Sequence, residues 1–368
     1  MNKLKAIYFF QYLPPWKIDV FNEMARMYDL TIVFWNVDCV GFTYDHQELL
    51  NKLNPEIDVI FLRNGINAGA HSLRLGINRI IRRISPQVIF SHEFAPITLQ
   101  CVLIKALQVH KYRLIITTSD NVFIADSVHG IKAMARYVIL KASDGIIVYS
   151  RKVAAWYQQK FPFVKAAICP NIQNPKSLLA NNELYYSIGQ SYRNEYNLNG
   201  CHVILYVGRL SLEKGIDLLL NAFARVSHNG WKLVVVGEGK EEKNLQTQAA
   251  QLGIVHDVVF AKFCSSEYLY AWYTLANFFV LPSRYEPFGA VVNEALVFGC
   301  PVLASKNIGA TDFINSTNGI IFDPYNVAQF VQVLTDGLRK YEECKYPRPN
   351  LMICSFEDSV AAYSNIIK

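Results

Sequence analysis

Short apolar segments alternate with helical segments through both halves of the sequence, and this alternation constrains the fold more than any other feature. The first half holds AIYFFQY (6–12), LTIVFWN (30–36), IDVIFLR (57–63), QVIFSHE (87–93), RLIITTSD (113–120) and DGIIVYS (144–150). The second half holds HVILYVG (202–208), KLVVVGEG (232–239), DVVFAKF (257–263), NFFVLPS (277–283), PVLAS (301–305) and GIIFD (319–323). Apolar strands that alternate with helices indicate parallel sheets with helices on both faces. We therefore predict an α/β fold with two such sheets.

The length of the chain predicts two domains. With 368 residues it exceeds what one hydrophobic core usually spans. The alternation breaks at residues 171–200, which are rich in Asn, Ser and Gly and carry Pro175. We place the interdomain linker at the start of this stretch, so that residues 1–172 form one domain and residues 173–348 the other. The closing SFEDSVAAYSNIIK is typical of a helix.

Composition excludes several classes of protein. An apolar fraction of 52% and a charged fraction of 18% fit a folded protein with large buried sheets, and no apolar run approaches the roughly 20 residues of a membrane helix. The eight cysteines are scattered without a C-x-x-C pair and the eight histidines do not cluster, which argues against a zinc site. We expect structural thiols in a reducing cytoplasm. The start, MNKLKAIYFFQYLPPW, is interpreted as a first strand because its apolar stretch is short and ends at Pro14-Pro15.

Positive charge is concentrated in the first half of the chain. Residues 1–180 hold 21 Lys/Arg against 12 Asp/Glu, whereas residues 181–368 hold 15 against 18. Much of the excess lies at helical spacing in HSLRLGINRIIRRISP (Arg74, Arg79, Arg82, Arg83), with a second basic helix at Lys132, Arg136 and Lys141. These cations are either the solvated faces of helices or a surface for an anionic membrane or a lipid-pyrophosphate acceptor. Nucleic acid is not expected, because no aromatic residues are interleaved with them.

Residues 280–303, VLPSRYEPFGAVVNEALVFGCPVL, combine a strand, a tight turn, a short helix and a second strand. The first amides of a helix that begins at Phe288-Gly289-Ala290 lack partners within the helix, and such an end attracts phosphate. Glu294 lies about one and a half turns into that helix, where its carboxylate can accept hydrogen bonds from a ribose diol. Glu286 in the turn can do the same for a sugar hydroxyl. Each acid alone would be taken for a surface charge, but two acids around this turn predict a phosphorylated sugar ligand.

This stretch resembles the signature of glycosyltransferase family 4, the retaining nucleotide-sugar transferases with two Rossmann-like domains. The matching residues are E-P-F-G-x-x-x-x-E followed by A-L-x-x-G-x-P-V, and VGRLSLEKGIDLLLNAF (207–223), VVVGEGKEEKNL (234–245) and NGIIFDP (318–324) occur in the order of that family. The resemblance covers roughly residues 185–330. It implies the GT-B fold, in which two parallel sheets face each other across a cleft and a terminal helix, here 349–368, crosses back onto the first domain.

The motifs place the donor-binding residues in the second domain. Gly208 ends a strand, and Arg209 and Lys214 supply cations beside the phosphates held by Phe288, Gly289 and Ala290. Because no Asp-x-Asp pair occurs, these cations and the helix dipole are expected to replace a metal ion. The resemblance adds Gly237 under the nucleotide and Phe263 near the base. Lys262 stands where the family often has glycine, which leaves the base open.

The resemblance assigns acceptor binding to the first domain. Family members often carry glycines in the first loop, but this chain has QYLPPWKID, with Pro14, Pro15, Trp16 and Lys17 in their place. Ser119 stands where many members have histidine and is followed by Asp120, while His92 matches another histidine at a strand end. We name His92, Asp120 and Glu286 as candidate catalytic residues. For His92 and Asp120 a purely structural role is the alternative.

The residues and the resemblance together predict a cytoplasmic, metal-independent hexosyltransferase that uses a nucleoside-diphosphate sugar as co-substrate and no other cofactor. Retention is implied by the resemblance to family 4 alone. The expected acceptor is a glycan or a lipid-linked glycan, as in polysaccharide synthesis, with peripheral contact at the inner face of the membrane as a further hypothesis. Two enzymatic alternatives use the same fold, a sugar-nucleotide epimerase and a phosphorylase. A non-catalytic, two-lobed ligand-binding protein is the alternative from another class.

Overall fold

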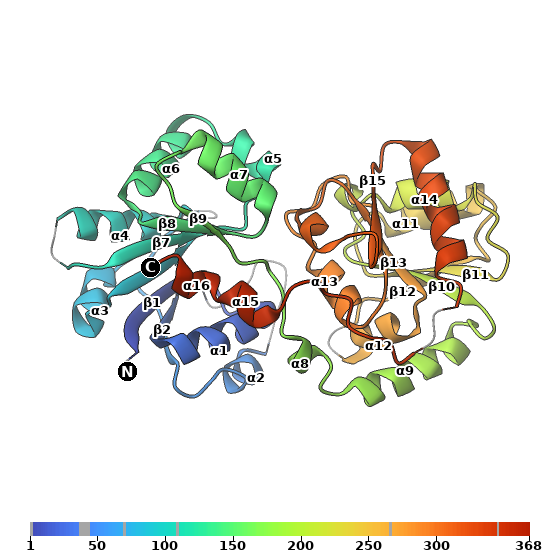
Figure 1. Ribbon diagram of the computed structural model, residues 1–368, viewed down its shortest axis with the longest axis horizontal. Coiled ribbons are helices and arrows are strands. Elements are labelled where there is room, and N and C mark those ends of the chain that lie inside the picture. The colour runs from blue at the N-terminus through green and yellow to red at the C-terminus, as the bar shows by residue number, and fades with distance from the viewer. Residues whose placement is uncertain (1–2, 37–44, 69–70, 108–109, 265–266, 344–345) are drawn as a thin grey trace. The chain divides into compact units, whose positions relative to one another are not determined.

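The chain forms two compact units in a computed structural model, which describes residues 3–36, 45–68, 71–107, 110–264, 267–343 and 346–368 (Figure 1). The first unit contains Met1–Asn174 together with Ser355–Lys368, and the second is Pro175–Cys354. The sequence placed these boundaries slightly earlier, at 172/173 and 348/349. Within the stretch 171–200, whose start was predicted to be the linker, residues 175–178 and 182–195 are helical.

Seven parallel strands form the sheet of the first unit, in the order β3-β2-β1-β6-β7-β8-β9. Its strands are β1 (Leu4–Phe10), β2 (Tyr28–Phe34), β3 (Asp58–Phe61), β6 (Val88–His92), β7 (Arg113–Thr117), β8 (Gly145–Val148) and β9 (Ala166–Ile168). Its helices are α1 (Ile18–Met27), α2 (His46–Asn51), α3 (Ile77–Ile84), α4 (Pro96–Ala106), α5 (Val122–Ser127), α6 (Gly130–Ala142), α7 (Arg151–Lys160), α15 (Phe356–Val360), α16 (Ala362–Asn365) and the 3₁₀ turn η1 (Pro15–Lys17). The central strands are buried on both faces, as their continuous apolar runs predict.

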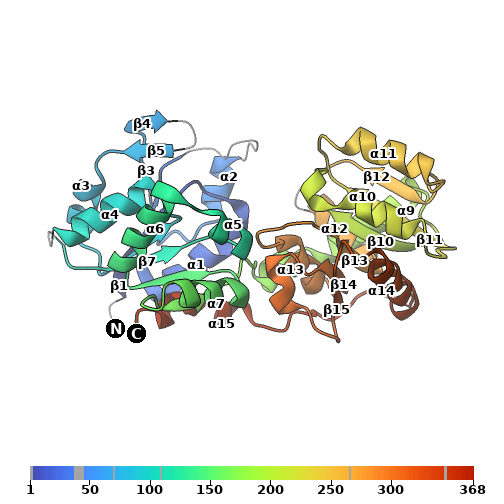
Figure 2. The ribbon, with the colours of Figure 1, turned by 90° about the horizontal axis from the view of Figure 1, so that it is seen from above.

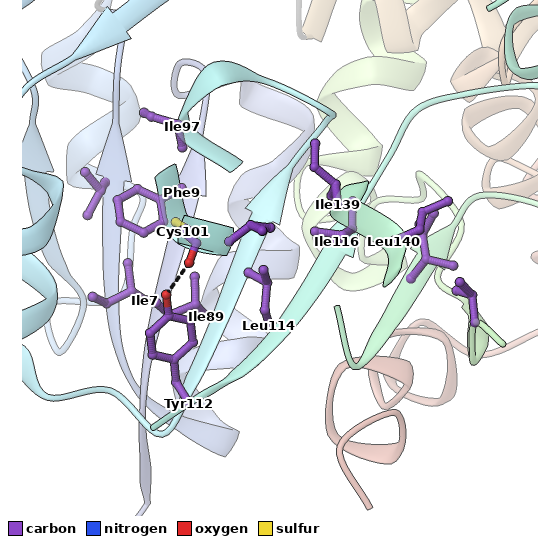
Figure 3. Packing of buried hydrophobic residues seen from close by; sticks show 14 of the residues in the cluster. Ile7, Phe9, Ile89, Ile97, Cys101, Tyr112, Leu114, Ile116, Ile139 and Leu140 are labelled. Carbon is purple, nitrogen blue, oxygen red and sulfur yellow. Dashed lines mark hydrogen bonds between the residues drawn. The ribbon is translucent and has the colours of Figure 1, made fainter. Parts of the chain in front are cut away.

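The hydrophobic core on one face of this sheet lies under α3, α4, α6 and α7. It includes Ile7 and Phe9 of β1, Ile89 of β6 and Cys101 of α4, with Tyr112 donating a hydrogen bond of 2.6 Å to the Cys101 carbonyl (Figure 3). Every cysteine among the described residues is a free thiol, and Cys101, Cys169 and Cys300 are buried. Cys39 and Cys344 lie outside the described residues.

The last residues of the chain cover the other face of the first sheet. The expected single helix is in fact two short ones, α15 and α16, joined at Ala361. Tyr363 packs edge-on against Phe90 with ring centroids 5.2 Å apart, and its hydroxyl lies 3.1 Å from that of Tyr8. The Tyr28 hydroxyl donates to the Tyr363 carbonyl at 2.8 Å. The C-terminal segment is thereby part of the core of the first unit.

A small antiparallel hairpin, β4 (Gly65–Ala68) with β5 (His71–Arg74), corrects one prediction. Arg74 was assigned to a basic helix, but it ends a strand and is buried. Its Nε donates a hydrogen bond of 2.8 Å to the Trp35 carbonyl, and its guanidinium donates one of 3.1 Å to Asn36 Oδ1. The helical part of the predicted run is α3, on which Arg79, Arg82 and Arg83 are exposed.

Six parallel strands form the sheet of the second unit, in the order β12-β11-β10-β13-β14-β15. Its strands are β10 (His202–Val207), β11 (Trp231–Val236), β12 (Val258–Ala261), β13 (Phe278–Leu281), β14 (Val302–Ser305) and β15 (Gly319–Phe322). Its helices are α8 (Pro175–Leu178), α9 (Asn182–Glu195), α10 (Ile216–Phe223), α11 (Glu242–Gln251), α12 (Glu267–Leu275), α13 (Ala290–Val297) and α14 (Val327–Lys340), with 3₁₀ turns η2 (Leu212–Lys214) and η3 (Gly309–Phe313). The predicted α/β class with two parallel sheets is confirmed.

Candidate functional site

The carboxyl ends of β10 and β13 form the point where the strand order of the second sheet reverses. From β10 the chain adds strands to one side, and from β13 it adds them to the other. Ligands of open parallel sheets bind beside such a reversal. The loop after β10 begins with Gly208 and the loop after β13 with Pro282, so two of the sequence motifs become neighbours here.

Two glycines let these loops approach each other closely. Gly237, after β11, has φ 154°, and a Cβ at this position would collide with the carbonyl oxygen of Gly208. Gly215, after η2, has φ 68°, and a Cβ there would collide with the carbonyl oxygen of Pro282. Only glycine fits such contacts, since other residues rarely adopt these φ angles and all carry a Cβ. The loops after β10, β11 and β13 therefore pack backbone against backbone.

Lys214 and Glu286 form an ion pair between the loop after β10 and the loop after β13, through Nζ and Oε2. Both side chains are 14% exposed, so the pair is largely shielded from water yet open at its rim. Glu286 Oε1 accepts no hydrogen bond from the described residues. Backbone bonding fixes the turn, because Glu286 N donates to the Asn307 carbonyl at 3.3 Å and Ala310 N to the Phe288 carbonyl at 2.8 Å.

Helix α13 begins immediately after this turn. Gly289 is its N-cap with φ 91° and no side chain caps the helix. Val292 N donates to the Gly289 carbonyl at 3.0 Å, which leaves the amides of Ala290 and Val291 for another acceptor. The Phe288 side chain turns into the core, where its ring lies 5.9 Å from that of Phe313. At this end of α13 it is the backbone of residues 288–290 that can face a ligand.

Glu294 lies on α13 and is nearly buried. Tyr273 of α12 donates a hydrogen bond of 2.9 Å to its Oε2. Burial and the Glu294 carboxylate raise the pKa of Tyr273 well above 10, so the phenol stays protonated and acts as a donor. Sequence reasoning missed Tyr273, since nothing in EYLYAWYTL distinguishes it from its neighbouring aromatic residues.

The remaining predicted donor residues lie at the same edge of the sheet but are less enclosed. The Arg209 side chain is mostly exposed, with its guanidinium 3.6 Å from Glu213 Oε1. Phe263 follows β12 and is exposed. In the order of the sheet, β12 is the third strand from β13. A bidentate pair that the sequence did not reveal, Arg284 with Asp217 at 2.6 Å for both bonds, ties the loop after β13 to α10.

In the first unit, His92 ends β6 beside the end of β7, and Glu93 follows it. The His92 ring stacks on Phe10 at 4.1 Å, its Nδ1 lies 3.1 Å from Thr117 Oγ1 and its Nε2 lies 3.5 Å from Glu93 Oε1. Thr117 Oγ1 also accepts a hydrogen bond from Tyr8, so this hydroxyl bridges Tyr8 and His92. Burial, then the charge of Lys17, lowers the pKa of His92 to about 3. His92 is thus neutral and held in place through Nδ1 and by stacking on Phe10.

Glu93 holds the loop after β7 in place. With φ 62°, it turns its carboxylate to accept hydrogen bonds from Ser119 N at 2.7 Å and Ser119 Oγ at 2.5 Å. Its other oxygen accepts from Thr118 Oγ1 at 2.9 Å. Ser119, which the resemblance placed where other proteins have histidine, therefore serves as a donor to this carboxylate.

Asp120 is committed to a buried ion pair. Its Oδ2 lies 3.0 Å from the Arg136 guanidinium and accepts a 2.6 Å hydrogen bond from Tyr157. Burial raises the pKa of Asp120, and Arg136 and Tyr157 oppose that shift. Arg136 also donates to the Ala125 carbonyl at 3.0 Å and stacks over Phe94 at 4.6 Å. Its assignment to an exposed basic face was wrong, because α6 turns this arginine inward.

Lys17 is the ionisable group at this edge that the described residues of the first unit leave without a counter-charge. It lies at the amino end of α1 and is buried, and its Nζ is 4.9 Å from the centroid of the Tyr149 ring. No described carboxylate pairs with it, and burial lowers its pKa. Sequence reasoning noted Lys17 only as part of a stiff aromatic loop.

Comparison with known proteins adds a family match for part of the chain. Residues 190–351 match the model for glycosyl transferases group 1. An uncharacterised glycosyltransferase of Methanocaldococcus jannaschii is 40% identical over 147 residues, which is 38% of this chain and 37% of that protein. The lipopolysaccharide 1,2-N-acetylglucosaminetransferase of Salmonella typhimurium is 31% identical over 182 residues, or 46% of each chain. The chain thus aligns with less than half the length of these two relatives.

Solved structures extend the likeness to the whole fold. The Anabaena protein HepE, in complex with UDP, superimposes with a TM-score of 0.71 at 17% identity and covers 99% of this chain and 97% of its own. At this identity the likeness concerns the fold, which is the two-domain α/β architecture of GT-B glycosyltransferases. The group 1 glycosyl transferase match therefore belongs to the second unit, which also carries the edge between β10 and β13.

Proposed function

We propose that this chain is a retaining glycosyltransferase of family 4 that moves a hexose from a nucleoside-diphosphate sugar to an acceptor hydroxyl. The observation that carries the proposal is the meeting of three features at the β10–β13 reversal. These are the Lys214–Glu286 ion pair, the uncapped amino end of α13, and Glu294 oriented by Tyr273. The family match over residues 190–351 and the UDP complex of the structural neighbour HepE support it.

The proposed donor lies with its diphosphate at the amino end of α13. The helix dipole and free amides favour an anion there, and Lys214 adds a cation. As the sugar bond breaks, the leaving diphosphate gains negative charge, so these fixed positive groups stabilise the transition state more than the ground state. Because the sequence has no Asp-x-Asp pair, we propose that this charge is balanced without a metal ion.

The two glutamates fasten the donor on either side of its diphosphate. Glu286 keeps one oxygen on Lys214 and has the other to accept from a sugar hydroxyl. Glu294 accepts from Tyr273, and we propose that its carboxylate also accepts from the ribose diol when the donor binds. A neutral Tyr273 and a charged Lys214 therefore pre-orient the two acids, which lowers the cost of ordering them when the donor binds.

The acceptor is proposed to bind at the first unit, as a glycan or lipid-linked glycan. In retaining chemistry on one face of the sugar, the departing diphosphate takes the acceptor proton, so no separate carboxylate base is required. This agrees with the structural engagement of Asp120 and with a neutral His92 that bonds to Thr117 and stacks on Phe10. The proposed contribution of His92 is to hold the acceptor pocket in shape.

Transfer assays with a panel of nucleotide sugars and glycan acceptors test the proposal. We expect one donor to be consumed in the presence of EDTA, with an α-linked donor giving an α-linked product by NMR. Glu286→Ala and Glu294→Ala should fold yet lose at least 100-fold in kcat/KM, whereas Glu241→Ala, an acid on the nearby loop before α11, should retain activity. Conversion of the donor to an epimer without acceptor, or wild-type rates in both variants, would contradict the proposal.

A further inference from the structure

Three helices that cover one face of the first sheet contain no acidic residue. They are α3 (INRIIRRI), α4 (PITLQCVLIKA) and α6 (GIKAMARYVILKA). Helix α3 packs against α4, and α4 against α6, so the three form a continuous layer (Figure 2). We call them the α3–α4–α6 layer. The outer face of a helix in a soluble protein usually carries both signs of charge, and this layer has only one.

The outer face of the layer also exposes aliphatic side chains. Ile131, Met134 and Val138 follow one stripe of α6 at positions i, i+3 and i+7, and Ile131 is 82% exposed. Leu103 and Leu107 form a second stripe along α4, and Leu107 is 74% exposed. The inner side of α6 already buries Ile139 and Leu140 in the core. The outer stripes are therefore additional apolar surface that the described part of this chain leaves uncovered.

Five exposed cations accompany these stripes. They are Arg79, Arg82, Arg83, Lys132 and Lys141, and none forms an ion pair with a described carboxylate. The other two cations of the layer are neutralised, since Lys105 pairs with Asp144 and Arg136 with Asp120. Lys141 extends over the exposed Phe163 ring with Nζ 4.9 Å from its centroid. A lysine whose aliphatic chain lies along an apolar group while its ammonium faces the polar phase is the arrangement found at membrane interfaces.

We propose that the α3–α4–α6 layer docks on an anionic lipid bilayer. The aliphatic stripes would enter the boundary between headgroups and acyl chains, and the five cations would face lipid phosphates. A second copy of this chain fits less well, because a two-fold interface would bring the same unpaired cations together. Nucleic acid also fits less well, because the two stripes consist of aliphatic side chains, and bases do not stack on these.

This docking does not depend on the donor chemistry and can be measured without it. The purified full chain is sedimented with vesicles of phosphatidylcholine alone and of phosphatidylcholine mixed with phosphatidylglycerol. We expect binding to the mixed vesicles only, weakened by high salt. Replacing Arg79, Arg82 and Arg83 by Gln should lower the partition coefficient roughly 100-fold, at roughly fivefold for each cation removed. Ile131→Ser/Met134→Ser/Val138→Ser should abolish binding.

Matched variants of the second unit serve as controls. Arg225→Gln/Lys243→Gln/Arg339→Gln removes the same charge from exposed positions, and Leu184→Ser/Val327→Ser removes exposed aliphatic side chains. Both should bind vesicles like the wild type, and circular dichroism should show all variants folded. Equal effects of control and layer variants, or equal binding to neutral vesicles, would overturn the proposal. Two further results would overturn it. One is a wild-type dimer in solution that the Ile131→Ser/Met134→Ser/Val138→Ser variant dissociates into monomers, and the other is RNA that competes with the vesicles for binding.

Discussion

The carboxyl edges of the two sheets are built in opposite ways. In the second unit the edge consists of closely packed backbone, with glycines at the contacts, an uncapped helix and a rim-exposed Lys214–Glu286 pair. In the first unit the edge is filled by side chains that bind one another, namely Glu93 to Ser119 and Asp120 to Arg136. At the edge of the second sheet, backbone amides are already in position to donate hydrogen bonds to a ligand. In the first unit most polar side chains at the edge already bind one another, and among the described residues no carboxylate pairs with Lys17.

Asp120→Asn gives the largest expected effect, and it tests whether the first edge is structural. The substitution leaves Arg136 buried without its counter-charge, so the free energy of unfolding in urea should fall by about 3 kcal/mol or more. Asp323→Asn is the control, because its pair with Lys306 is solvent-exposed and should contribute less than about 1 kcal/mol. A folded Asp120→Asn protein of wild-type stability that has lost transfer activity would return Asp120 to catalysis.

Gly237→Ala tests the backbone edge of the second unit. Its Cβ would collide with the Gly208 carbonyl, so the loops after β10 and β11 must separate, and we expect a loss of roughly 2–3 kcal/mol in the free energy of unfolding. Gly253→Ala is matched to it, since Gly253 also has a positive φ (72°) but open space around it, and should lose only about 1 kcal/mol. Equal losses in the two variants would show that the loops can part freely.

Per pH unit, the smallest effect is a pH dependence of stability at His92. Its pKa is about 3 in the folded protein against an ordinary 6.5. Between these values the unfolded chain binds a proton that the folded chain does not, so stability is retained above pH 6.5 and falls as the pH drops through this window. His92→Gln should reduce the slope of stability against pH by about 1.4 kcal/mol per pH unit between pH 4 and 6. The exposed His256→Gln variant is the control, and an unchanged slope in His92→Gln would mean that the ring is accessible to protons.

The sequence predicted the elements that depend on continuous apolar runs. All twelve predicted strands are present, because such runs are typical of strands buried on both faces. Strand β9, with three residues, and the β4–β5 hairpin were not predicted, because they are too short or too polar to show this pattern. They form by pairing with neighbouring strands.

The candidate site was predictable where a motif depends on backbone, and less so where it depends on side-chain partners. The neighbouring positions of Gly208, Gly237 and the start of α13 follow from strand ends meeting at one edge. The inward turn of Arg136 and the hydrogen bonds of Glu93 depend on contacts between distant residues. Helical spacing shows which residues share a face, but the structure is needed to show what that face contacts.

Nucleotide binding to the second unit tests the central claim most directly. Thermal unfolding of the full chain is followed with UDP, GDP, ADP and dTDP, and the dissociation constant of the best ligand is measured for the wild type and for Glu294→Gln. We predict that at least one nucleotide raises the melting temperature, and that Glu294→Gln binds it at least tenfold more weakly while melting at the same temperature without ligand. If no nucleotide shifts the transition, or if both proteins bind equally well, the β10–β13 edge is not a donor site.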